Sequence, residues 1–287
     1  MSKVWLVTGS SRGLGRHIVE AALAAGERVV ATARDPKQLD DLAALHGERV
    51  KIAALDVVDP AAAQAAVQVA LDAFGRLDVL VNNAGFGHIA PFEQTPEDDF
   101  HAQIDTNFYG VVNVTRAALP AMRAQKSGHI LNVSSVGGRM GTAGMAAYQS
   151  AKWAVGGFTE VLREELTPIG IHMTALEPGG MATDWGQEAG SRIPALLPDY
   201  EPSIGALLKL FADYMGKERG DPRRVAQVVL ALAYHDAPPA HLLLGSDALH
   251  FASQAEAARN TAGEQWREIT LSTDFGTDGA IPAMPRA

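Results

Sequence analysis

Tyr148 and Lys152 are the residues whose types and spacing point most directly to chemistry. On a helix, side chains four residues apart lie one turn apart on the same face, so the ammonium would stand near the phenol. A free phenol has a pKa of about 10, but a nearby cation favours the phenolate and lowers that pKa. A tyrosine tuned in this way can exchange a proton near physiological pH. The pair alone also fits a packed ring beside a solvated lysine, because this spacing occurs by chance on many surface helices.

Two further polar residues stand where a site could use them. Ser135 follows the expected strand 128–133, at its carboxyl end, and the tyrosine helix comes next. By itself this hydroxyl could simply satisfy a turn. Asn107 lies inside an expected apolar helix, where asparagine is disfavoured. Its amide therefore either faces water or has a specific function.

A glycine-rich segment, Thr8–Gly15, joins the apolar run 4–7 to a helical pattern that includes Ile18 and Val19. Glycines let a backbone approach a pyrophosphate closely, and a helix N-terminus favours its negative charge. The spacing is Gly-x-x-x-Gly-x-Gly, which differs from the familiar G-x-G-x-x-G. The segment predicts a dinucleotide site, and a plain glycine-rich turn is the alternative.

The end of the second expected strand, 28–33, bears on the choice of cofactor. Arg34 follows it, and Arg12 in the glycine segment is a second candidate to clamp the 2′-phosphate of NADP. Asp35 could instead bind the 2′-hydroxyl of NAD, or cap a helix that begins at Pro36. We expect NADP rather than NAD.

Strand and helix patterns alternate along the whole chain. The expected strands are 4–7, 28–33, 50–55, 77–81, 128–133, 171–176 and 241–244. Capped helix starts with proline at the first position are expected at Asp59-Pro60, Thr95-Pro96 and Asp221-Pro222. This alternation predicts an α/β fold with a Rossmann-type, doubly wound parallel sheet of about seven strands. We expect a single domain over residues 1–265 and a C-terminal extension over 266–287, whose last part, from Asp274, is expected to fray.

The segment 184–220 is expected to shape the substrate site. Apolar residues at 204, 207, 208, 211 and 215 form one helical stripe, and Trp185 precedes them. A mobile apolar lid would admit an apolar substrate and exclude water. The stripe could equally well pack on the domain. Further pocket candidates by position are Phe86, His88, Met140 and Met145, although His88 could be an ordinary loop histidine.

Composition excludes several kinds of site. The 287 residues include no cysteine, which rules out disulfides, thiolate metal sites and a cysteine nucleophile. The nine histidines show no H-x-x-x-H pairing, so no metal is expected. The net charge is −9 without a basic block, which argues against nucleic acid as a partner. No apolar run is long enough to span a bilayer, so we expect a soluble, cytoplasmic protein without a membrane partner.

Together these motifs resemble the short-chain dehydrogenase/reductase family, from about residue 3 to 250. The matching motifs are Thr8-Gly9-x3-Gly13-x-Gly15, Asn82-Asn83-Ala84-Gly85 and Pro178-Gly179-x3-Thr183. Asn107, Ser135, Tyr148 and Lys152 are similar to the family's catalytic tetrad in order and spacing. The resemblance implies a cofactor site made of Gly9, Ser11, Arg12, Gly13, Leu14, Gly15, Arg34, Asp56, Val57, Asn83, Ala84, Gly85, Tyr148, Lys152, Pro178, Gly179 and Thr183.

The resemblance also implies a mechanism, in which hydride passes between the nicotinamide and a carbonyl or alcohol carbon. Tyr148 would exchange the proton, Ser135 would hold the substrate oxygen, and Lys152 would lower the Tyr148 pKa and bind the nicotinamide ribose. Asn107 would support a water chain that returns protons to Lys152. We expect an NADP-dependent oxidoreductase that acts on the carbonyl or secondary alcohol of an apolar small molecule.

Two alternatives remain at this point: an NAD(P)-binding redox sensor or regulator without turnover, and a lyase or epimerase on the same fold. The resemblance further implies a homodimer or homotetramer. A dimer through the helices that bear Asn107 and Tyr148 is expected, while the extra C-terminal stretch argues against the tetramer.

Overall fold

One parallel sheet of seven strands forms the centre of the molecule. The computed structural model describes residues 2–276 and 280–285. The strand order is β3-β2-β1-β4-β5-β6-β7, and every pair of neighbours is parallel. The strands are β1 (Val4–Val7), β2 (Arg28–Ala33), β3 (Val50–Ala54), β4 (Val79–Asn82), β5 (Gly128–Val133), β6 (Ile171–Pro178) and β7 (His241–Leu244). This is the predicted Rossmann-type fold.

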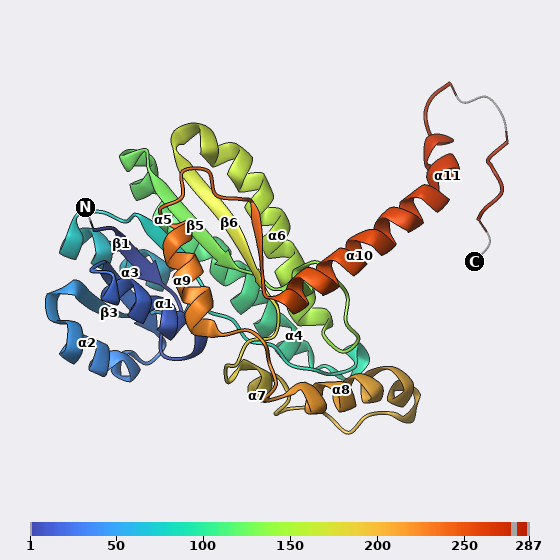
Figure 1. Cartoon of the computed structure of the whole chain (residues 1–287), viewed down its shortest axis with the longest axis horizontal. Helices are drawn as coiled ribbons and strands as arrows, with labels where there is room; N and C mark the ends of the chain where they lie inside the picture. The colour runs from blue at the N-terminus through green and yellow to red at the C-terminus, as the bar shows by residue number, and fades with distance from the viewer. Residues whose placement is uncertain (1, 277–279, 286–287) are drawn as a thin grey trace.

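Helices cover both faces of the sheet (Figure 1). Apolar residues of α1, α2 and α9 pack in one buried cluster, and those of α3, α5 and α6 pack in the other. Because both faces are covered, strands such as β1 and β5 are buried at every position, and β1 reads as a continuous apolar run. The longer helices are α1 (Gly13–Ala24), α2 (Asp40–His46), α3 (Pro60–Phe74), α4 (Glu97–Ile104), α5 (Gly110–Gln125), α6 (Ala146–Leu166), α8 (Ala206–Tyr214), α9 (Pro222–Leu232) and α10 (Ser246–Gln265).

The strand order places a ligand site at one edge of the sheet. The chain moves outward from β1 to β3, then returns to the other side of β1 with β4. In doubly wound sheets, ligands bind outside the carboxyl ends of the strands where the order reverses in this way. The glycine segment after β1 and the Asn-Ala-Gly segment after β4 both lie at that point.

Several predicted boundaries are wrong by a few residues. The expected fourth strand began at Leu77, but β4 begins at Val79, because the backbone of Leu77 is bonded at both its N–H and its carbonyl by the side chain of Gln125. The caps at Asp59 and Asp221 are confirmed. The cap at Thr95 is not, because α4 begins after Pro96 and the Thr95 hydroxyl donates to the Pro91 carbonyl instead.

Two segments extend beyond the sheet and its covering helices. The segment 184–220 contains α7 (Trp185–Ala189), a π-helical turn (Glu201–Gly205) and α8, and lies along one edge of the body (Figure 1). The helix α10 begins at Ser246 and projects from the body, with the short helix α11 (Arg267–Leu271) at its end (Figure 1). The predicted extension 266–287 is thus partly helical, and residues 277–279 and 286–287 lie outside the described part of the chain.

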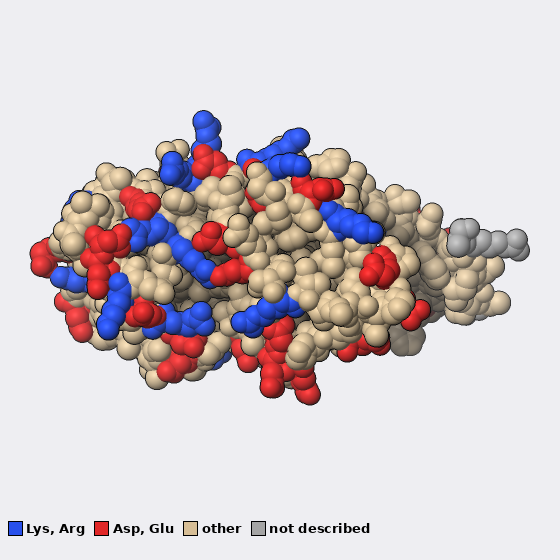
Figure 2. Space-filling model, turned by 90° about the horizontal axis from the view of Figure 1, so that it is seen from below, with Lys and Arg blue, Asp and Glu red and all other residues tan. Residues whose placement is uncertain are grey.

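The surface carries charges of both signs. On the face shown in Figure 2, lysine and arginine side chains are interspersed with acidic ones, and no continuous basic area forms. Within residues 2–276 and 280–285, no helix is both long enough and apolar enough to cross a membrane.

Candidate active site

The tyrosine and lysine lie together on α6, as their spacing predicts. Tyr148 is 8% exposed and Lys152 is 4% exposed. The lysine Nζ lies 5.6 Å from the centroid of the tyrosine ring and donates a 2.8 Å hydrogen bond to the carbonyl oxygen of Val133, the last residue of β5. This bond attaches α6 to the strand that carries Ser135 at its end.

The pKa of Tyr148 moves in the direction opposite to the one expected. Burial raises it to about 12, and a hydrogen bond with the Ser135 side chain lowers it by a smaller amount. Burial also lowers the pKa of Lys152 to about 8, because removing the ammonium from water disfavours its charge. Desolvation of the phenolate therefore outweighs the proximity of the lysine here. The phenol keeps its proton at neutral pH, as a proton donor must.

The two serines after β5 have separate functions in the fold. Ser134 is 2% exposed, and its hydroxyl donates to the carbonyl oxygen of Lys152 at 3.0 Å. The Ser135 Oγ accepts a 3.0 Å bond from the N–H of Gly137, which orients it as the cap of a short 3-10 turn. Ser135, not its neighbour, is the residue that meets the phenol.

Asn107 is fully buried in a π-helical turn (Asp105–Tyr109) between α4 and α5. Its Nδ2 donates to the carbonyl oxygens of Phe86 at 2.7 Å and Gln103 at 2.8 Å. Its Oδ1 is buried without a hydrogen-bond partner. A Cβ atom on Gly85 would lie 2.5 Å from this oxygen and 3.5 Å from the Lys152 Nζ, so both groups face the same small space. The amide therefore has a fixed orientation and a free acceptor beside the lysine.

The glycine segment is shaped to admit a pyrophosphate. Gly9 and Gly13 have φ angles of 65° and 55°, which L-residues with side chains rarely adopt. A Cβ on Gly15 would lie 2.3 Å from the Gly9 carbonyl oxygen and 2.4 Å from the Asn83 Nδ2. No side chain caps the N-terminus of α1, so its first amides remain available to an anion.

Neighbouring residues hold this segment in place. The Thr8 Oγ1 accepts bonds from the backbone N–H groups of Asn83 and Ala84, each at 2.9 Å, and the Asn83 Nδ2 donates to the carbonyl oxygens of Thr8 and Gly9. Leu14 is buried in the core, which leaves only its backbone to face a ligand. Ser11 lies half-buried in the same turn. The residues present thus fit a bound dinucleotide.

Of the two arginines predicted to bind a 2′-phosphate, Arg34 is exposed at the end of β2. Arg12 forms a bidentate ion pair with Glu188 of α7, in which one bond from Nη2 to Oε2 measures 2.7 Å. Asp35 caps the 3-10 turn that Pro36 begins, through a 3.1 Å bond from the N–H of Lys37. Its carboxylate therefore has the capping function that we considered as the alternative to ribose binding.

Asp56 and Val57 follow β3 at the same edge of the sheet. The Asp56 Oδ1 accepts a 3.2 Å bond from the N–H of Val58, so it also acts as a turn residue. Val57 is buried against Gly110, and its carbonyl oxygen accepts a 3.1 Å bond from the Asn113 Nδ2. These contacts attach the segment to α5.

The segment after β6 is held by Asp247, which the sequence analysis missed. Its Oδ2 accepts bonds from the Gly180 N–H at 2.8 Å and from the Tyr214 hydroxyl at 3.2 Å. A Cβ on Gly179 would lie 2.3 Å from the other carboxylate oxygen. The first turn of α10 thus fixes the segment that begins at Pro178, while the Thr183 side chain lies against Gly13 of the glycine segment.

The apolar stripe of the segment 184–220 faces the protein. Ile204 is buried, and Leu207, Leu208, Phe211 and Met215 are half-buried. The Trp185 ring lies against Tyr148, with centroids 5.0 Å apart. His88 binds Asp99 through a 2.7 Å contact of its Nδ1, which favours the reading of an ordinary loop histidine.

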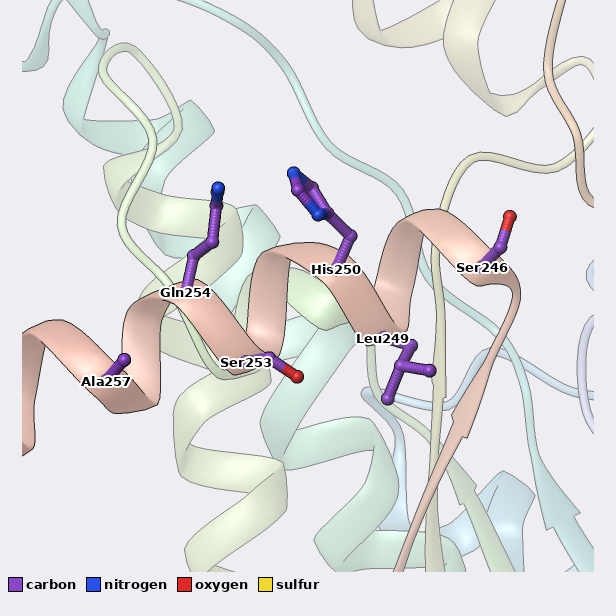
Figure 3. A pocket seen from close by; sticks show the side chains of 6 residues that line it. All are labelled: Ser246, Leu249, His250, Ser253, Gln254 and Ala257. Carbon is purple, nitrogen blue, oxygen red and sulfur yellow. The ribbon is translucent and has the colours of Figure 1, made fainter.

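An open pocket of about 480 Å³ lies on α10 (Figure 3). All of its lining residues belong to that one helix: Ser246, Leu249, His250, Ser253, Gln254 and Ala257. None of them carries the chemistry described above, so the tetrad and not this pocket defines the candidate site. In the described part of the chain, no group of three or more histidine, cysteine or acidic side chains could hold a metal ion.

Comparison with known proteins identifies the class. A family model of short chain dehydrogenases matches residues 3–193. Oxidoreductase BOA17 of Botryotinia fuckeliana (strain B05.10) is 47% identical over 276 residues, which cover 95% of this chain and 100% of that protein. The chain therefore belongs to the short-chain dehydrogenase/reductase family of oxidoreductases.

Solved structures of dehydrogenases are also similar to this chain. A short-chain dehydrogenase from Streptomyces avermitilis superposes with a TM-score of 0.89 at 36% identity, covering 96% of this chain and 100% of that one. An alcohol dehydrogenase from Thermococcus sibiricus, in complex with 5-hydroxy-NADP, has a TM-score of 0.69 at 26% identity and covers 85% of this chain and 96% of that one. The solved neighbours include complexes with NADP and with NADH.

Proposed function

We propose that this protein is an NADP-dependent reductase of ketones or aldehydes on apolar small molecules. The observation that carries the proposal is the arrangement of the four predicted residues, in which the buried Tyr148 meets Ser135 at the carboxyl end of β5. A donor that keeps its proton at neutral pH suits reduction, where the substrate oxygen must gain one.

The reaction follows from the positions of the side chains. The bound nicotinamide supplies the hydride. The Ser135 hydroxyl hydrogen-bonds the carbonyl oxygen and orients it, and Tyr148 transfers its phenolic proton to that oxygen as negative charge develops there. Lys152, held by Val133, places its charge next to the phenol and is positioned to bind the ribose. The free Oδ1 of Asn107 can accept a hydrogen bond from a water that returns a proton to the lysine.

Two features support NADP over NAD. The arginines at positions 12 and 34 both lie at the edge where the adenosine ribose would be held, and guanidinium groups pair well with phosphate. Asp35, the acid that was considered for the 2′-hydroxyl, caps the turn at Pro36 through one carboxylate oxygen. We further propose a homodimer through the helices around Asn107 and Tyr148, where Tyr109 and Val161 are exposed; light scattering in solution would test it.

The function is tested by following NADPH and NADH oxidation against a panel of ketones, aldehydes and quinones, with Tyr148→Phe as the comparison. We expect turnover with NADPH and a loss of at least about a hundredfold in Tyr148→Phe, because general acid catalysis contributes roughly 10²–10⁴-fold. Unchanged turnover in that variant would refute the proposal. Tight NADPH binding without turnover on any carbonyl would favour the alternative of a redox sensor.

A further inference from the structure

The indole ring of Trp185 packs against the phenol ring of Tyr148. The ring centroids of Trp185 and Tyr148 lie 5.0 Å apart at an interplanar angle of 49°. Gly87, which follows the fourth strand, makes this contact possible. A Cβ atom there would lie 2.9 Å from the indole Cζ2 and 2.9 Å from the phenol Cδ2. The three residues meet at one point, and any side chain at position 87 would force the rings to shift.

Contacts at the end of α7 and with the segment after α8 hold the indole in position. The carbonyl oxygen of Ala189 accepts a 3.3 Å bond from the N–H of Ile89, which lies two residues after Gly87. Gly186 packs against Met215 of the segment after α8. These contacts fix the backbone of the helix, and with it the indole.

The place of the substrate follows from the proton donor. A reacting carbonyl oxygen must come within hydrogen-bond distance of the Tyr148 and Ser135 hydroxyls. The group attached to the carbonyl carbon then extends away from these hydroxyls, and the half-buried indole is in ring contact with the phenol. Aromatic rings prefer offset or tilted contacts with centroids 4.5–7 Å apart, and such pairs gain more than apolar burial alone.

We propose that Trp185 determines substrate specificity and selects carbonyl compounds that carry an aromatic ring next to the carbonyl group. This inference rests on the proposed reductase function and names the substrate class of the same site. A saturated ring of equal size would gain only apolar contact from the indole. The aromatic ring gains the additional ring–ring interaction, so the preference between the two reports on Trp185.

The test compares an aryl methyl ketone with cyclohexyl methyl ketone, with NADPH as cofactor. For each variant, kcat/KM for the aryl ketone is divided by kcat/KM for the saturated one, which cancels effects common to both substrates. We expect Trp185→Phe to retain the wild-type ratio and Trp185→Leu to lower it about fivefold, the order expected for one aromatic pair. The matched control Trp266→Leu, at an exposed tryptophan beyond the end of α10, should leave the ratio unchanged.

Gly87→Ala provides a second variant that keeps the indole. Its φ lies outside the left-handed region, so the added methyl acts through contact with the two rings. We expect Gly87→Ala also to lower the ratio of kcat/KM for the aryl ketone to kcat/KM for the saturated ketone. This result would support the proposal even if Trp185→Leu failed to fold. A ratio that is unchanged in both variants would overturn the specificity role and leave the reductase standing. No turnover of any carbonyl, with NADPH still bound, would overturn the reductase and this inference with it.

Discussion

At the scale of single residues, burial sets the chemistry of the tetrad. The pKa of Tyr148 is raised and that of Lys152 is lowered by the same cause, which is the removal of charge from water. The pair therefore favours a neutral phenol at all ordinary pH values, while the lysine loses its charge just above neutrality. Lys152, and not Tyr148, is therefore the group that titrates in the working pH range.

The pH profile of ketone reduction should follow the loss of charge on Lys152. The ammonium of Lys152 is present below its pKa of about 8 and is lost as the pH rises through that value, while the phenol remains protonated until about 12. We expect kcat/KM for ketone reduction to be level below about 8 and to fall above it. In Lys152→Arg, which keeps its charge to much higher pH, whatever activity remains should not show that fall.

The matched control is Lys209→Arg at an exposed lysine, which should keep the wild-type profile. A profile that stays level to pH 10 in the wild type would show that the lysine charge does not assist proton transfer.

At the scale of elements, the site depends on contacts between segments that lie far apart in the sequence. The first turn of α10 holds the segment after β6 through Asp247, and α7 is tied to the glycine segment by Arg12 and Glu188. The elements themselves were predictable, because strands buried on both faces appear as unbroken apolar runs and glycines mark the turns. The contacts were not, because a carboxylate at position 247 has no local pattern that reveals a partner at Gly180.

Asp247 should position the segment after β6, which we expect to bind the cofactor, without taking part in the chemistry. Asp247→Ala leaves the Gly180 N–H and the Tyr214 hydroxyl without their acceptor. We expect the dissociation constant of NADPH, measured by fluorescence, to rise about tenfold, since leaving a partly buried donor unpaired costs roughly 1–3 kcal/mol. Asp247→Asn retains an acceptor oxygen and should recover most of the affinity. Equal affinity in Asp247→Ala and the wild type would contradict this role.

The ion pair between Arg12 and Glu188 should compete with the cofactor phosphate. In Glu188→Gln the arginine is released, and we expect KM for NADPH to fall about threefold while KM for NADH stays the same, as fits the small free energy of an exposed ion pair. Glu164→Gln makes the same change of charge at an exposed position of α6 and serves as the control. A rise in KM for NADPH would mean that Glu188 instead orients the arginine for phosphate.

At the scale of the whole molecule, the buried polar groups of the sheet influence stability as well as the site. His129 on β5 is 4% exposed, and its Nε2 lies 3.1 Å from the Thr174 Oγ1 on β6. Burial, with a smaller effect of the neighbouring His172, lowers its pKa from 6.5 to about 3. No sequence pattern indicated this, because the shift depends on how completely the assembled sheet excludes water.

This histidine predicts a loss of stability in mild acid. Below pH 6.5 the unfolded chain binds a proton at His129, whereas the folded chain does not until about pH 3, so falling pH favours unfolding. Between pH 7.5 and 4.5 we expect this group to contribute about 2–3 kcal/mol to the loss in unfolding free energy, measured by urea titration. His129→Gln should show a flatter pH dependence than the wild type. Parallel curves for wild type and His129→Gln would contradict the assignment.

Hydride transfer to a carbonyl carbon can be followed directly with isotopes. Purified protein would be given NADPH deuterated at both C4 hydrogens and a ketone that it turns over, and the alcohol product would be analysed by mass spectrometry and NMR. We expect one deuterium on the carbinol carbon, none on the hydroxyl after exchange with water, and loss of the labelled product in Tyr148→Phe. An alcohol that carries only solvent hydrogen at that carbon would contradict the reductase mechanism.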